Sequence, residues 1–125
     1  GMYERRVGER YMHSNNFAAM FAAGAVVCGG SDSDVTEPRP MLGIHAAVNR
    51  TVPQCAVSVE QAIEMYTVNG AYALFEDKRK GKLAPGYLAD IVVLDRDSRT
   101  APAEQLEQPA VTVTIKSGSV LHSRQ

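Results

Sequence analysis

The stretch that decides the fold is Ala25–Val35, AVVCGGSDSDV. Its first four residues, Ala25–Cys28, form a short apolar run that is typical of a strand rather than a helix. Gly29 and Gly30 allow the backbone to leave this strand through conformations closed to other residues. The loop that follows carries hydroxyls and carboxylates at the carboxyl end of the strand, where parallel α/β folds collect their ligand-binding and catalytic groups.

Three side chains of this loop are candidate site residues: Ser31, Asp32 and Asp34. Two interpretations stay open on the residues alone. In the first, an aspartate acts on a ligand. In the second, Asp32 or Asp34 only caps a turn or the helix that follows.

Helices are expected on both sides of the loop. Residues 15–23 end before Gly24 and carry Phe17, Met20 and Phe21 at the spacing of a core-facing stripe. The MLGIHAAVNR segment, 41–50, predicts a second helix after the extended, proline-bearing residues 36–40.

Residues 58–74 predict a long helix that begins with a capping box, in which Ser58 and Gln61 bond each other's backbone amides. We expect Tyr66, Thr67 and Asn69 to pack within this helix rather than to touch a ligand.

The second half of the chain changes to a strand pattern. Residues 91–94 are an unbroken apolar run between two aspartates and predict a buried strand. Residues 111–116 alternate apolar and polar side chains, and 119–122 predict a partner strand across a turn at Ser117-Gly118. Residues 103–106 predict one helical turn. A single strand in the first half cannot bury and pair both its edges. The chain therefore either associates with copies of itself or is the end of a longer polypeptide.

Composition excludes several classes of protein. The formal net charge is −1 and no block of like charges occurs, which argues against nucleic acid or an anionic membrane as partner. No apolar run reaches the ~18 residues of a membrane span, and the polar start is not a signal peptide, so we expect a cytoplasmic protein.

Gly1 before Met2 is typical of a cleaved expression tag. Cys28 and Cys55 lack metal-type spacing and are expected to be reduced. The histidines His13, His45 and His122 are too isolated to share a metal.

The segment GKLAPGYLADIVVLDRD, 81–97, closely resembles the C-terminal signature of the amidohydrolase superfamily. Residues 23–35 resemble the eighth barrel strand with its terminal aspartate, and 41–50 and 58–74 resemble the helices after it. The nearest branch is the amidohydrolase-3 type, which includes N-substituted formamide deformylase-like enzymes. The resemblance implies the C-terminal fragment of a (β/α)8 barrel, in the α/β class. Its last barrel strand and helices lie in 2–75, and β-strands of the small β-sandwich domain lie in 76–125.

The same resemblance implies a metal-dependent hydrolysis of carbon–nitrogen bonds in small amide-type molecules. Asp32 matches the aspartate that binds a divalent metal, commonly zinc, or its water, and that takes and returns a proton. Ser31, Pro40 and Arg50 match recurring positions of structural character. The chain has no His-x-His and no bridging lysine, so we expect the isolated chain to bind no metal and to be inactive.

One residue departs from the family pattern. Members of this branch read Ser-Asp-x-Pro-Val, and Asp34 stands where they have proline. The exchange frees the loop and adds a charge, so Asp34 could alter the substrate preference. Two alternatives to the hydrolase remain: a non-catalytic, self-associating module that binds a small ligand, and a chain that docks on a separate barrel fragment.

Overall fold

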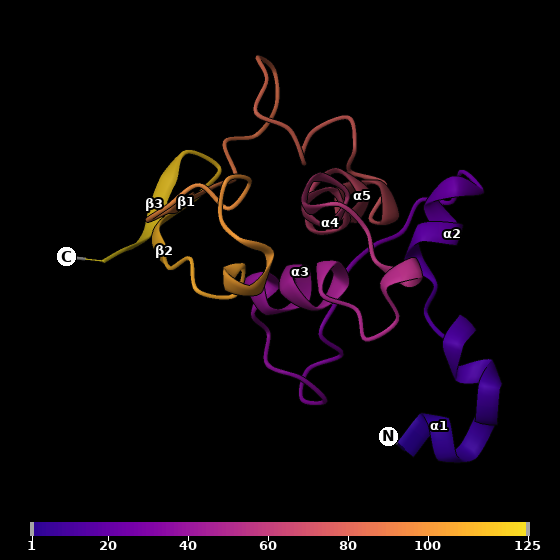
Figure 1. The fold of residues 1–125 in the computed structure, drawn as a ribbon. Coiled ribbons are helices and arrows are strands. Elements are labelled where there is room, and N and C mark those ends of the chain that lie inside the picture. Colours follow the sequence, from indigo (N-terminus) through magenta and orange to yellow (C-terminus); the bar gives the residue numbers. More distant parts are fainter. Residues whose placement is uncertain (1, 125) are drawn as a thin grey trace.

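The computed structural model describes residues 2–124 and consists of a helical body and a small sheet (Figure 1). The helices lie to the right of Figure 1 and the sheet lies to the left, with a long connection between α5 and β1 that loops out at the top. In chain order the elements are α1 (Met2–Val7), η1 (Gly8–His13), α2 (Phe17–Ala22), α3 (Pro40–Val48), η2 (Pro53–Cys55), α4 (Val59–Tyr66), α5 (Val68–Ala73), β1 (Ile91–Leu94), η3 (Ala103–Gln105), β2 (Val111–Lys116) and β3 (Ser119–Ser123).

The core of the helical body lies between α3, α4 and the segment that joins them. Apolar side chains that recur on one face of each helix meet there, as the sequence pattern requires. The buried cluster consists of Ile44, Ala47, Val57, Ala62 and Met65, and the half-buried side chains packed against it include Phe17, Phe21 and Val27. The core thus joins α2 and the Ala25–Cys28 segment to the two central helices.

The predicted capping box is confirmed. The Ser58 hydroxyl accepts a hydrogen bond from the Gln61 amide, and the Gln61 side chain accepts one from the Ser58 amide. The donor–acceptor distance is 3.1 Å in both bonds. The single long helix predicted over 58–74 is wrong, because the backbone breaks at Thr67, with φ −125° and ψ −95°. The Thr67 hydroxyl donates to the Ile63 carbonyl over 2.8 Å. This local bond competes with the helical ladder, and a separate helix, α5, begins at Val68.

The strand predicted at Ala25–Cys28 is not formed in the structure. The described residues hold one sheet, and it does not include this segment. A parallel strand needs neighbouring strands to pair its backbone groups, and residues 2–124 supply none. Helices provide substitutes instead: Asn69 donates to the Val27 carbonyl over 3.0 Å, and the Gly29 amide donates to the Met65 carbonyl over 3.0 Å.

The sheet is antiparallel, with the order β1-β2-β3, and the two strands at the turn form the predicted hairpin. Both residues of its turn, Ser117 and Gly118, have positive φ, as this kind of tight hairpin requires. Two aspartates hold the ends of β1. Asp90 accepts a hydrogen bond from the Ser117 amide over 2.8 Å, and Asp95 accepts one from the Ala110 amide over 3.0 Å. The aspartates that flank the apolar run therefore fix where β2 begins and ends against β1.

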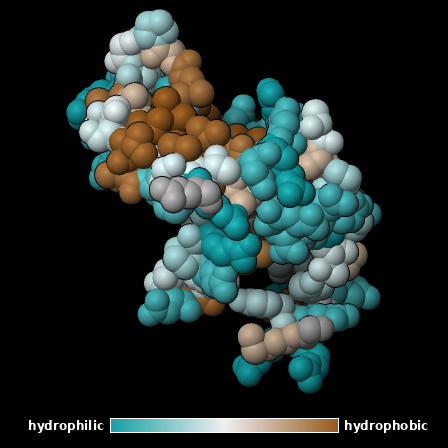
Figure 2. Space-filling view, turned by 90° about the vertical axis from the view of Figure 1, so that its left-hand side faces the viewer, coloured by the Kyte–Doolittle hydropathy of each residue, from teal (hydrophilic) through white to brown (hydrophobic). Residues whose placement is uncertain are grey.

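The prediction that residues 91–94 are buried is wrong for this chain. Figure 2 views the side on which the sheet lies, and hydrophobic side chains gather in a patch in its upper part. Val92 and Val93 of β1 are exposed, and in β3 Val120 is 61% exposed and Leu121 is 65% exposed. Neighbouring residues of a strand point to opposite faces, so these four side chains lie on both faces of the sheet. A sheet buries its apolar side chains only when further layers cover it, and within the described chain none covers these four residues.

Candidate active-site loop

The candidate site is a tight turn that follows the Ala25–Gly30 segment. Asp32 has a positive φ of 49°, and its carbonyl accepts a hydrogen bond from the Val35 amide over 2.7 Å. The Thr36 hydroxyl donates to the Ser31 carbonyl over 2.6 Å. Aspartate tolerates the left-handed conformation better than most residues do. Two hydrogen bonds thus close the loop and hold Asp32 at its tip.

The Asp32 side chain is exposed and makes no hydrogen bond or ion pair with the described residues. The Asp34 carboxylate is exposed as well and accepts a hydrogen bond from the Ser33 hydroxyl over 3.3 Å. The capping interpretation gains no support for either side chain, because Asp34 caps no helix among residues 2–124 and Asp32 contributes only its carbonyl to the turn. The Asp32 carboxylate therefore has no partner among residues 2–124.

The segment before the loop is anchored to the two central helices. Besides the Gly29 and Val27 bonds, the Cys28 thiol donates to the Asn69 carbonyl over 3.1 Å. The Tyr66 ring lies between Gly29 and Gly43, and a Cβ at either glycine would overlap it. Burial raises the pKa of Tyr66, so its phenol stays protonated at neutral pH. The two glycines allow a close approach between the segment, α3 and α4.

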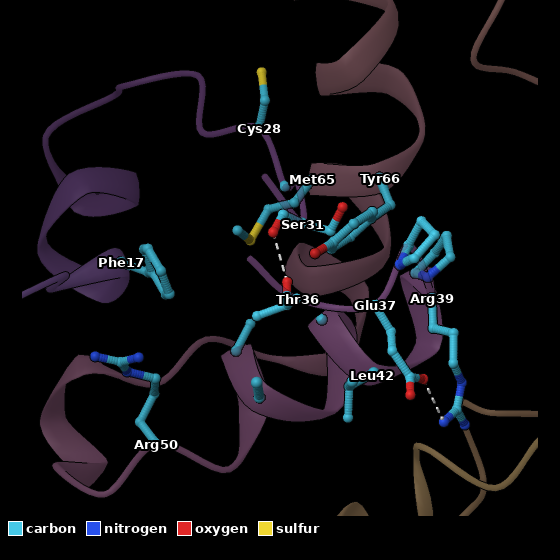
Figure 3. Close-up of a pocket in the computed structure, with 17 residues that line it drawn as sticks. Phe17, Cys28, Ser31, Thr36, Glu37, Arg39, Leu42, Arg50, Met65 and Tyr66 are labelled. Atoms are coloured by element: carbon cyan, nitrogen blue, oxygen red, sulfur yellow. Dashed lines mark hydrogen bonds and ion pairs between the residues drawn. The ribbon is translucent and has the colours of Figure 1, made fainter. Parts of the chain in front are cut away.

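A pocket of about 490 Å³ lies beside the loop (Figure 3). In the close-up, Phe17 and Arg50 form one side, and Met65, Ser31 and Thr36 lie opposite them. The pocket lining includes Ser31, while Asp32 and Asp34 lie outside it. The structure therefore separates the three candidate residues: Ser31 faces the pocket, and the two aspartates face solvent.

The described residues do not form a metal centre. Among residues 2–124, no three histidine, cysteine, aspartate or glutamate side chains come close enough to hold an ion. His45 lies on α3 beside Asn49, whose amide nitrogen is 3.2 Å from Nδ1 of His45. One exposed carboxylate, that of Asp32, cannot supply the three or four ligands that a catalytic site for a divalent metal needs.

Comparison with known proteins gives the class to which the chain belongs. A model of the amidohydrolase family matches residues 1–122. The chain is a member of the amidohydrolase family, as the 81–97 signature predicts. A solved amidohydrolase from Thermotoga maritima superposes with a TM-score of 0.68 at 21% identity, over 88% of this chain and 26% of that one. At this sequence identity the likeness shows a shared fold and nothing more.

Individual relatives bear several activities in their names. An imidazolonepropionase of Kosmotoga olearia is 40% identical over 82 residues, which cover 66% of this chain and 19% of the relative. An N-substituted formamide deformylase of Arthrobacter pascens is 29% identical over 126 residues, which cover 94% and 23%. The putative amidohydrolase YtcJ of Bacillus subtilis is 29% identical, covering 84% and 22%. The chain thus spans about a fifth of the length of these relatives.

The sequence does not reveal the roles that two residues of the site have in the structure. Thr36 is the donor that closes the loop, and the five-residue spacing from Ser31 in a loop has no recognisable pattern. The sequence predicts a structural role for Arg50, and in the structure Arg50 forms part of the pocket wall. An arginine at the end of a helix is ordinary, so only the folded positions of Phe17 and Ser14 reveal its surroundings.

The described helices offer no candidate for a membrane span, since none of them is both long enough and apolar enough. Both cysteines are free thiols, as expected: Cys28 is exposed and Cys55 is buried.

Proposed function

We propose that this chain is the C-terminal part of a hydrolase that acts on carbon–nitrogen bonds of small, non-peptide amide-type molecules. In this proposal residues 2–75 are the end of the barrel, with Ala25–Cys28 as its last strand, and residues 76–125 contribute strands to a β-sandwich. The lack of a strand partner for Ala25–Cys28 among residues 2–124 and the exposed apolar side chains of the sheet both support a chain that packs against further strands. We expect the isolated chain to be inactive.

The observation that carries the proposal is the position of Asp32. Its carboxylate stands at the tip of a turn that two hydrogen bonds close, without a partner among residues 2–124, directly after the glycines that end the Ala25–Cys28 segment. An exposed carboxylate without a partner keeps both oxygens available to accept hydrogen bonds. In the proposed reaction Asp32 takes a proton from the attacking water and gives it to the leaving nitrogen, as general base and then general acid.

Family membership implies a divalent metal, and zinc is the ion that we propose for the intact enzyme. The described residues do not form that centre. Its remaining ligands would have to come from residues outside this chain, whether in the same polypeptide or in another. Ser31 and Asp34 are proposed as loop residues on the substrate side, with Asp34 influencing the choice of substrate.

The first test is to determine whether the source DNA encodes a His-x-His region upstream of this chain or in a separate chain. With such a region present, the complete polypeptide is assayed on N-substituted formamides and cyclic amides. Asp32→Asn should lower kcat by roughly 10²–10⁴-fold, because general acid–base catalysis contributes about that much. Glu104→Gln, which changes an exposed carboxylate in η3, is the matched control and should leave kcat unchanged. Absence of such a region both upstream and in a separate chain, or an active Asp32→Asn variant, would refute the proposal.

The alternative function is a self-associating module that binds a small ligand without turnover. It is favoured by the exposed apolar residues of β1 and β3 and by the pocket beside the loop. Metal analysis separates the two functions. The chain is dialysed against trace zinc and analysed by mass spectrometry beside Asp32→Ala. Stoichiometric zinc that disappears in the variant supports assembly of a hydrolytic site from several copies. Light scattering that detects only monomers over a wide concentration range would exclude self-association.

A further inference from the structure

The pocket beside the Asp32 loop carries a charged residue, Arg50, in its wall. Its lining is mostly apolar and includes Phe17, Leu42, Ala47 and Met65. Its volume, about 490 Å³, lies within the range of small-molecule sites. In such sites a few polar groups determine which ligand binds, so the chemistry of the pocket depends on Arg50.

Arg50 uses only part of its hydrogen-bonding capacity. Nη2 donates to the Ser14 carbonyl over 3.2 Å, and the guanidinium carbon lies 5.1 Å from the centre of the Phe17 ring. Within residues 2–124, Nε is buried and has no partner, and Nη1 makes no hydrogen bond. A guanidinium carries five N–H donors and no acceptor, and a partly buried cation without a counter-ion is unfavourable. The group therefore lacks an acceptor with a negative charge.

The other charged groups of the pocket do not supply this counter-ion. Glu37 pairs with Arg39, with 3.3 Å between Oε2 and Nη1, so these two charges offset each other. The Tyr66 phenol is neutral, because burial raises its pKa. Ser31 and Thr36 contribute uncharged hydroxyls, and the Thr36 proton is already donated. The wall thus carries the net positive charge of Arg50 over an apolar surface.

We propose that this pocket binds a small monocarboxylate with an apolar body, and that Arg50 holds the carboxylate through Nη1. The apolar lining receives the body of the ligand. A single arginine beside apolar residues suits a monoanion better than a phosphate, whose charge and oxygens call for several donors. The proposal does not depend on hydrolysis, since Asp32 is outside the lining. It adds a ligand class that the proposed function does not specify.

The test compares benzoate with benzamide as probes on the 125-residue chain, by isothermal titration and ligand-detected NMR. Both share the apolar ring, and only benzoate is charged. We expect benzoate to bind about tenfold more tightly, a difference of about 1.4 kcal/mol. Arg50→Gln should remove this preference and leave benzamide binding unchanged. Arg79→Gln, which changes an exposed arginine outside the pocket, should keep it.

Arg50 also bonds Ser14 and packs on Phe17, so Arg50→Gln could lose binding by misfolding. A second variant, which leaves Arg50 in place, therefore tests the pocket independently. Ala46 is exposed on α3 and lines the pocket, so Ala46→Leu fills the pocket without entering the core. It should weaken both probes by at least about tenfold. Equal binding of the two probes, benzoate binding that survives Ala46→Leu, or no saturable benzoate binding at all would overturn the proposal. Binding is measured without turnover, so an inactive hydrolase site does not affect the result.

Discussion

Two glycines in helices should respond to alanine in opposite directions. Gly43 in α3 lies against the Tyr66 ring, and a Cβ there would overlap the phenol oxygen and lie 2.6 Å from Cζ. Gly70 in α5 has open space, because a Cβ there would lie 3.8 Å from its nearest neighbour, the Met65 carbonyl oxygen. Alanine favours a helix over glycine by about 1 kcal/mol, so propensity alone stabilises both variants.

At Gly43 the overlap should exceed this gain. The ring also packs closely against Gly29, where a Cβ would overlap it as well, and this limits the room that the ring has to move. Overpacking of this kind costs about 1–3 kcal/mol. We therefore expect Gly43→Ala to lower the free energy of unfolding by up to about 2 kcal/mol after the propensity gain. Gly70→Ala should raise it by about 0.5–1 kcal/mol.

Urea denaturation at one fixed protein concentration measures both changes. The Gly70→Ala variant serves as the matched control, since it makes the same substitution in a helix without the neighbouring ring. Equal stabilisation in the two variants would refute the position of Tyr66 between Gly29 and Gly43. A Gly43→Ala loss that vanishes when Tyr66 is also changed to alanine would support it, because the double variant removes the overlapping ring.

Three further predictions concern stability. Ser58→Ala removes the capping box of α4 and should cost about 1 kcal/mol in thermal or urea unfolding, whereas Ser119→Ala, at an exposed sheet position, should cost little. Leu106→Ala should cost about 2–5 kcal/mol, because Leu106 is 0% exposed; a loss below that of Ser58→Ala would contradict its burial. The hydrogen bond from the Ala110 amide lowers the pKa of Asp95 in the folded state. The stabilisation of the fold by this bond is therefore complete above the pKa of the unfolded state, and it is lost as the pH falls through the lower pKa of the folded state. Asp95→Asn should therefore make melting less dependent on pH between about pH 5 and about pH 3, and an unchanged acid profile would refute this role.

The sequence predicts those parts of the fold that local chemistry determines. The capping box at Ser58, the end of α2 before Gly24 and the hairpin turn at Ser117-Gly118 all depend on residues close together in the chain. Each of these features is present in the structure. The family, too, follows from a short signature, because the spacing of its glycines and aspartates in 81–97 is specific.

The errors arise where distant groups decide the outcome. The Ala25–Cys28 run has the composition of a strand, and the pairing that would make it one needs other strands. Residues 91–94 have the composition of a buried strand, and burial needs a second layer. The break at Thr67 depends on a side-chain hydrogen bond that any helical threonine could make. In each case the residue pattern records a preference, and the surroundings determine whether it is satisfied.

The candidate site follows the same division. Asp32 could be selected from the sequence because it follows two glycines at the end of an apolar run, and its role stays a prediction. The unused donors of Arg50 could not be foreseen, because Ser14, Phe17 and the helices that surround the pocket come from separate parts of the chain.

The two aspartates that flank β1 give the sheet a property that its exposed apolar side chains would not suggest. Asp90 and Asp95 accept hydrogen bonds from the backbone amides directly after and directly before β2, so the alignment of β1 and β2 does not depend on a covering layer. These strands then lose their conformational entropy when the chain itself folds, before any further layer binds. A second layer that adds to the sheet meets a surface that is already organised, and association loses less affinity to ordering than it would with a flexible hairpin.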